Sequence, residues 1–120
     1  MRELVTVMCA LVVFAMAGHA AAPTLSVEIQ VAPATIVLKA PCNWVTIHAD
    51  IAYSSVQRDS VKINGLNADS VFADSCGNLV AKIAFERITE LVSPPTAEIV
   101  LTGVTTDGVA FGGSEIVRVK

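Results

Sequence analysis

The sequence contains few aromatic residues, few basic residues and only two histidines. Aromatic side chains make up 5% of the 120 residues, and 8 Lys and Arg stand against 11 Asp and Glu, for a net charge of -3. Proteins that bind nucleic acids cluster positive charge against phosphates, so this balance argues against a nucleic-acid partner. Hydrophobic side chains make up 53% of the chain, which excludes a disordered protein.

The first twenty residues have the layout of a secretory signal peptide. Arg2 precedes an uncharged run over residues 4–17, and small residues follow it. Gly18 and Ala20 fit the third and first positions before a signal peptidase cut, so we expect cleavage after Ala20. The predicted product is one exported domain, residues 21–120, in the periplasm or outside the cell, with no membrane span left after cleavage.

Two alternatives for this segment stay open. Residues 4–22 nearly reach the roughly 20 apolar residues that cross a bilayer, so an uncleaved anchor is the first alternative. The second is a lipoprotein modified at Cys9. Residues 6–8, Thr-Val-Met, lack the small residue that normally precedes a lipidated cysteine, so we assign Cys9 to the discarded segment.

Two cysteines, Cys42 and Cys76, remain in the predicted mature chain. An even number in a small exported domain favours a disulfide over reactive or metal-binding thiols. A redox-active pair is disfavoured because the sequence has no C-x-x-C motif. We predict a structural disulfide that links loops at one end of the fold. The bond closes a separation of 34 residues (76 minus 42), which contributes about 3 to 4 kcal/mol if the geometry is unstrained.

The mature chain alternates apolar and polar residues in short segments separated by Gly, Pro, Asn, Asp and Ser. This period of two predicts β-strands. The expected strands cover residues 25–31, 35–39, 45–51, 61–63, 68–73, 79–85, 99–105 and 109–119. Both faces of 79–85 are largely apolar, so we expect that strand to be central. Seven or eight short strands are typical of an all-β, immunoglobulin-like sandwich.

Local signals refine this prediction. Phe85, Ile88 and Val92 recur at helical spacing, which predicts one short helix that ends before Pro94. The pairs at 64–65 and 107–108, Asn-Gly and Asp-Gly, predict tight hairpin turns. The pair Gly112-Gly113 predicts a bulge in the last strand.

Several of these segments resemble a small secreted β-sandwich repeat of bacteria and archaea that often stands beside dockerin or other calcium-binding repeats. The segments that carry the resemblance are Val27-Glu28-Ile29, Ala40-Pro41-Cys42-Asn43-Trp44-Val45-Thr46, Ser60-Val61-Lys62-Ile63-Asn64-Gly65, Asn78-Leu79-Val80-Ala81-Lys82-Ile83 and Ile99-Val100-Leu101-Thr102-Gly103. Pieces of the last hairpin extend it: Asp107-Gly108, Phe111-Gly112-Gly113 and Ile116-Val117-Arg118-Val119. The resemblance implies a non-catalytic extracellular module.

The chain departs from this family at its calcium-binding segment. Relatives often carry an Asp-rich D-x-D-G-D stretch there, whereas residues 73–78 offer one carboxylate, Asp74. Asp69 and Asn78 are additional candidates if the loop folds back, but Ca²⁺ needs six or more oxygen ligands. We therefore expect no metal and no cofactor, with the disulfide as the loop clamp.

Catalytic signals are weak. His48 and Asp50 share one face of a predicted strand, a spacing compatible with an oriented imidazole, but the chain has no G-x-S-x-G motif. We expect a solvent-exposed pair and no enzyme. One histidine and two paired cysteines likewise supply no zinc site. Glu86 and Glu90 are expected to be solvated on the short helix.

Trp44 is the residue best suited to binding, because an exposed aromatic on a strand can stack on a sugar or fill a partner's pocket. The other interpretation is that Trp44 packs over the neighbouring disulfide and one edge of the sandwich. We predict an exported structural or protein-interaction module with a secreted or cell-surface protein partner. The alternative is a ligand-binding module for polysaccharide or calcium.

Overall fold

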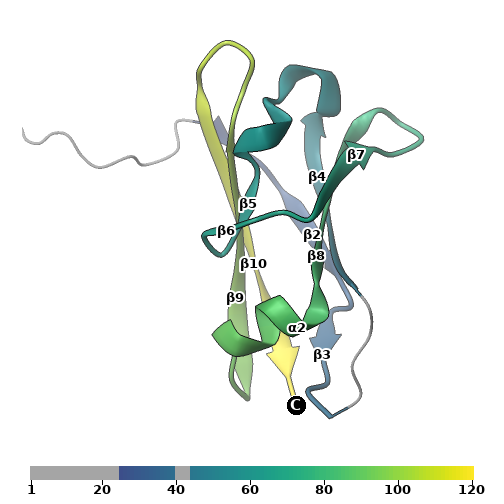
Figure 1. The fold of residues 1–120 in the computed structure, drawn as a ribbon, viewed down its shortest axis with the longest axis vertical. Coiled ribbons are helices and arrows are strands. Elements are labelled where there is room, and N and C mark those ends of the chain that lie inside the picture. The colour runs from purple at the N-terminus through teal and green to yellow at the C-terminus, as the bar shows by residue number, and fades with distance from the viewer. Residues whose placement is uncertain (1–24, 40–43) are drawn as a thin grey trace, which may run out of the picture.

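The computed structural model describes residues 25–39 and 44–120, and these residues form two facing β-sheets (Figure 1). The first, called here the β10 sheet, has the order β1-β10-β9-β5-β6, and β3 also pairs with β10. Its strands are β1 (Leu25–Ser26), β3 (Thr35–Ile36), β5 (Lys62–Ile63), β6 (Leu66–Asn67), β9 (Thr96–Val104) and β10 (Ala110–Val119). The second, the β4 sheet, has the order β2-β4-β8-β7. Its strands are β2 (Ile29–Ala32), β4 (Trp44–Ala52), β7 (Ser70–Ala73) and β8 (Asn78–Ala84).

The predicted all-β sandwich is confirmed, and its core lies between the sheets. Along β4, Val45, Ile47 and Ala49 are buried while Trp44 and His48 are exposed, as a period of two requires. Strand β8 lies between β4 and β7, so the prediction that it is central also holds. On its outer face Val80 is buried while Lys82 and Ala84 are half-buried, so its two faces differ less in polarity than those of β4.

The predicted helix and turns are present. Helix α2 (Phe85–Ile88) continues into a 3-10 turn, η4 (Thr89–Leu91), and closes the lower end of the sandwich in Figure 1. Asn64 and Gly65 have φ of 50° and 84°, the left-handed pair that a two-residue hairpin turn needs between β5 and β6. No helix in residues 25–39 and 44–120 is long and apolar enough to cross a membrane. The predicted signal peptide, residues 1–20, lies outside the described residues.

The segment from residue 53 to residue 60, expected as a loop, contains two 3-10 turns, η2 (Tyr53–Ser55) and η3 (Arg58–Ser60). Val56 between them is buried and bridges to Thr105, so the segment closes the end of the sandwich opposite α2.

The strand predicted over residues 25–31 is divided between the two sheets. Leu25 pairs with Phe111 in the β10 sheet, parallel to β10, whereas Ile29 pairs with Ala49 in the β4 sheet. At the crossing, the Val27 N–H donates to the Gly112 carbonyl at 2.9 Å. An alternating pattern shows which side chains face the core but not which sheet supplies the backbone partners, so the sequence did not reveal the crossing.

The predicted bulge at Gly112-Gly113 is wrong. The β10–β9 register continues through both glycines, with Gly113 opposite Leu101. A side chain at Gly113 would instead collide with the Val27 carbonyl oxygen. A glycine within a strand marks either a bulge or the close approach of another backbone. Here the second cause applies, because the crossing segment lies directly against β10 at Gly113.

The predicted Cys42–Cys76 disulfide is not found: Cys76 is an exposed free thiol, and Cys42 lies outside the described residues.

The close approach at Gly113 generates a test. Gly113→Ala should lower the free energy of unfolding by about 3 kcal/mol, because backbone must move to admit the methyl group. Urea unfolding monitored by the fluorescence of Trp44 measures this loss. Ser114→Ala, at the exposed neighbouring position of the same strand, should change stability by less than about 0.5 kcal/mol. Equal stability of the two variants would contradict the packing described.

Candidate functional site

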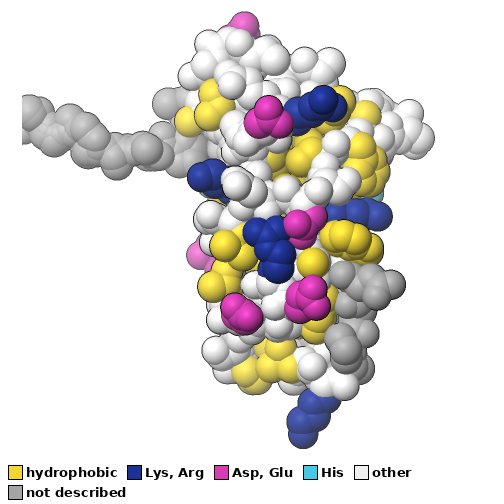
Figure 2. Space-filling view, viewed as in Figure 1, with side chains coloured by type: hydrophobic (Ala, Val, Ile, Leu, Met, Phe, Trp, Pro, Cys, Tyr) yellow, Lys and Arg dark blue, Asp and Glu magenta, His cyan; other side chains and the backbone are white. Residues whose placement is uncertain are grey.

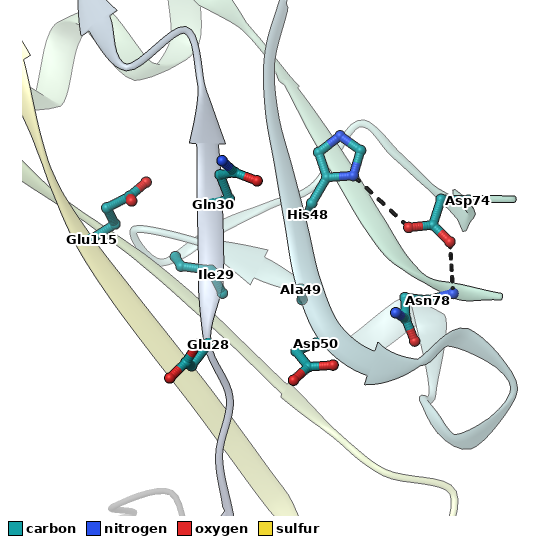
Figure 3. Close-up of a pocket in the computed structure, with 9 residues that line it drawn as sticks. All are labelled: Glu28, Ile29, Gln30, His48, Ala49, Asp50, Asp74, Asn78 and Glu115. Atoms are coloured by element: carbon teal, nitrogen blue, oxygen red, sulfur yellow. Dashed lines mark hydrogen bonds and ion pairs between the residues drawn. The ribbon is translucent and has the colours of Figure 1, made fainter. Parts of the chain in front are cut away.

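The outward face of the β4 sheet brings together most of the residues singled out in the sequence. Trp44, His48 and Asp50 alternate with buried residues along β4 and are exposed. Asn78 begins β8 opposite Ala52, at the Asp50 end of β4, and Asp74 lies in the turn before Asn78 (Figure 3). We call this surface the outer face.

An open hollow of about 460 Å³ lies at the β2 edge of this face, where residues of β2, β4 and β10 line it (Figure 3). Four carboxylates contribute to its lining, and we call it the acidic hollow. Its residues are Glu28, Ile29, Gln30, His48, Ala49, Asp50, Asp74, Asn78 and Glu115. The carboxylates come from β10, β4, the turn before β8 and the segment before β2, so chain segments distant in sequence create one negative surface.

Asp74, a carboxylate of the hollow, accepts two backbone hydrogen bonds. One oxygen, Oδ1, accepts hydrogen bonds from the backbone N–H of Cys76 at 2.8 Å and of Asn78 at 3.0 Å. Gly77 has a φ of 84° and donates its N–H to the Asp74 carbonyl at 3.0 Å. These bonds fold the side chain of Asp74 back onto its own turn, a common role for aspartate.

His48 faces Asp74 and not its predicted neighbour Asp50. Its Nδ1 lies 4.0 Å from Asp74 Oδ2, and the His48 side chain is 49% exposed. That separation exceeds a hydrogen bond, so the carboxylate does not orient the imidazole as a general base requires. His48 and Asp50 are both exposed on one strand face, as the sequence predicts.

The three candidate calcium ligands do not converge. Asp69 accepts a hydrogen bond from the Ala84 N–H at 2.7 Å and forms an ion pair with Arg87 at 2.6 Å. This places Asp69 at the end of β8, whereas Asp74 and Asn78 lie at its start. Within the described residues, no group of three His, Cys, Asp or Glu side chains is arranged to hold a metal ion.

Two large aromatic side chains are exposed on the outer face. Trp44 is 43% exposed at the start of β4, and Phe72 on β7 is 39% exposed. Phe72 pairs with Val80, which pairs with His48, so the three belong to one row across the sheet. Lys82 Nζ lies 5.5 Å from the centre of the Phe72 ring, within the range of a cation–π contact.

Sequence reasoning missed Phe72, Gln30, Glu28 and Glu115. A signal existed for Glu115, because it shares a strand face with Phe111 and Val117 and is the only charged residue in that series. Its carboxylate accepts a hydrogen bond from the Val31 N–H at 2.7 Å, between the two sheets. Glu86 and Glu90 are exposed, as expected.

Comparisons with protein-family models, with curated proteins and with solved structures give no match to this chain. Arguments about its function therefore start from its own residues.

The role of Asp74 as a turn-forming residue can be measured. Asp74→Ala should lower the free energy of unfolding by about 1 kcal/mol, because two backbone N–H groups lose their acceptor. Asp74→Asn keeps one oxygen acceptor and should recover part of the loss. Asp50→Ala, at an exposed carboxylate of the same hollow, serves as the control in urea unfolding. If Asp50→Ala is as destabilising as Asp74→Ala, the hydrogen bonds of Asp74 are not the cause.

Proposed function

We propose that the chain is a non-catalytic, exported structural or protein-interaction module with an immunoglobulin-like fold. One observation supports the fold and another supports export. The order β2-β4-β8-β7 in one sheet and β5-β9-β10 in the other follows the ABED and CFG arrangement of such sandwiches. The signal-peptide pattern of residues 1–20 supports export.

The features of the outer face support a role in protein interaction. It combines an exposed Trp44 with the acidic hollow on a sheet whose backbone is held by hydrogen bonds on both sides of β4 and β8. Trp44 lies on the same face as the hollow, four residues along β4 from His48. Exposed aromatic side chains of this kind are typical of protein-binding hot spots. The expected partner is a secreted or cell-surface protein that covers Trp44 and offers positive charge to the hollow.

Capture from the native host tests this role. The tagged chain should retain a secreted or envelope protein and show no catalytic turnover. Trp44→Ala should lower the yield of that partner by about tenfold or more, the size expected for a hot-spot residue. Ile116→Ala is the matched control, because Ile116 is 63% exposed on the outward side of the β10 sheet. Recovery of the chain alone, or an equal effect of both variants, would contradict the proposal.

Binding of a polysaccharide is a second candidate, favoured by the exposure of Trp44 on a face that also presents polar groups. Trp44 is the only tryptophan, so its emission reports contact with a sugar directly. Under this alternative, a soluble glycan panel should shift the emission, and His48→Ala should weaken the glycan's affinity by about tenfold if His48 also contacts the sugar. An emission spectrum unchanged by every glycan of the panel would eliminate polysaccharide binding and leave the protein-interaction role.

A further inference from the structure

The outward face of the β10 sheet is more apolar than a sheet face exposed to water normally is. In an antiparallel sheet with one solvated face, the outward positions are mostly polar. Along β9 and β10 the outward positions, which alternate with buried ones, include Val100, Val104, Ala110, Gly112 and Ile116. Ile116 is the most exposed large hydrophobic side chain of the described residues. Exposed apolar surface that is shared by neighbouring strands marks an interaction site.

The side of the sandwich that carries α2 has a different character. Figure 2 shows basic and acidic side chains close together on that side. Asp69 and Arg87 form an ion pair there, at 2.6 Å. Charged side chains are depleted from the centres of protein interfaces, so the outward face of the β10 sheet is the better docking surface.

An open groove of about 400 Å³ runs along this outward face. Gly112 and Ser114 of β10 line it and contribute no side chain or a small one. Val27 of the crossing segment borders the groove on one side, and Val100 and Thr102 of β9 border it on the other. The groove is therefore wide enough and apolar enough to receive one hydrophobic side chain.

The groove and Ile116 lie on opposite sides of Ser114. Gly112 and Ile116 are each two residues from Ser114 along β10, and all three alternate with the buried positions of the strand. A two-fold axis that crosses the strands at Ser114 sets Ile116 of each copy over Gly112 of the other. The surface thus carries both a projecting side chain and the groove that fits it.

The charges of the face have the same symmetry. Glu98 pairs with Ile116, while Lys62 lies in the same row as Gly112, on the far side of β9. The axis that sets Ile116 over Gly112 therefore sets Glu98 over the row that contains Lys62 of the other copy. The two charges then lie one strand apart, about 4.8 Å sideways, within reach of their long side chains.

We propose that two copies of the chain pack face to face through their β10 sheets, about a two-fold axis at Ser114. Each Ile116 fills the groove of the other copy, and each Glu98 pairs with Lys62 of the other copy. The two sheets lie about 10 Å apart, as in the packing of sheets within a sandwich. The contact is isologous, so it closes a dimer and leaves no free copy of the surface.

Charge excludes the neighbouring registers. An axis at Ile116 would set Glu98 against Glu98, and an axis at Gly112 would set Lys62 against Lys62. Like charges opposed across an interface cost several kcal/mol. The apolar fit and the charge fit thus select the same axis, at Ser114. This coincidence favours a second copy as the occupant, because an unrelated partner requires no symmetry in the surface that it covers.

Sedimentation equilibrium tests for the dimer. The full chain, with reductant to keep Cys76 from bridging copies, should show a reversible dimer at concentrations up to about 1 mM. Ile116→Ala should weaken the dimer at least about tenfold. Leu91→Ala is the matched control, because Leu91 is exposed on η4, away from this face. A monomer at every concentration, or dimers equally strong in both variants, would overturn the proposal.

Charge reversal tests the register. Lys62→Glu and Glu98→Lys should each weaken the dimer at least about tenfold, because like charges then meet at both contacts. Tagged Lys62→Glu should nevertheless retain untagged Glu98→Lys from a mixture, since opposite charges meet again, while neither variant retains untagged copies of itself. Glu90→Lys, the same change at an exposed position of η4, should dimerise as the unmodified chain does. Unweakened single variants, or a mixture that does not associate, would overturn the proposal.

Cross-linking locates the axis. In a chain whose cysteines are all replaced by serine, a short bismaleimide should join two copies of Ser114→Cys, because these positions face each other across sheets about 10 Å apart. Arg118→Cys, exposed on the same face, should react at least about tenfold more slowly, since its two copies lie about 26 Å apart along the strands. Equal rates at the two positions would contradict the axis.

The dimer contact and the partner site lie on opposite sheets, because Trp44 belongs to the β4 sheet. Ile116→Ala should therefore give a monomer that still retains its partner through Trp44, whereas Trp44→Ala should give a dimer that has lost the partner. Each proposal can fail while the other holds.

Discussion

The crossing of the chain between the two sheets at Val27 and Glu28 is the constraint on which the rest of the structure depends. The segment that includes β1, β2 and β3 pairs with β10 at both ends and with β4 in the middle. Val27 donates to Gly112, and Val31 donates to the carboxylate of Glu115. These contacts close one side of the sandwich, and glycine at 113 allows the close approach.

The crossing also determines where binding groups gather. Glu28 and Gln30 reach the acidic hollow because the chain leaves β10 at Val27 and joins β4, and Glu115 reaches it because β10 runs beside that crossing. On the opposite side the chain crosses between the sheets again, from β6 to β7. There the Ala68 N–H donates to the Val61 carbonyl at 3.2 Å, and the Asp69 N–H donates to the Lys82 carbonyl of β8 at 2.8 Å. Both sides of the sandwich therefore have a segment that bonds to each sheet.

Much of this fold could be predicted from the sequence because it depends on local signals. Alternation identified the buried face of β4, and Asn64-Gly65 identified the turn between β5 and β6. The division of residues 25–31 between sheets could not be predicted, because it depends on backbone partners far away in the chain. Gly113 was misinterpreted for the same reason, since the close contact that excludes a side chain comes from Val27.

The site was predicted only in part. Trp44, His48 and Asp50 were placed on one exposed face by alternation alone, whereas the approach of Asp74 to His48 depends on the pairing of β4 with β8. Asp69 and Asp74 are close in sequence, but β7 holds them apart, at opposite ends of β8.

Amide hydrogen exchange at Val27 and Val31 tests the central role of the crossing most directly. If the crossing segment clasps the sheets, both amides should exchange only in global unfolding, with the same free energy of opening as the core amides of Ile47 and Leu101. Exchange at Val27 and Val31 through a local opening much less costly than global unfolding would contradict the account, because the sandwich would then persist without its clasp.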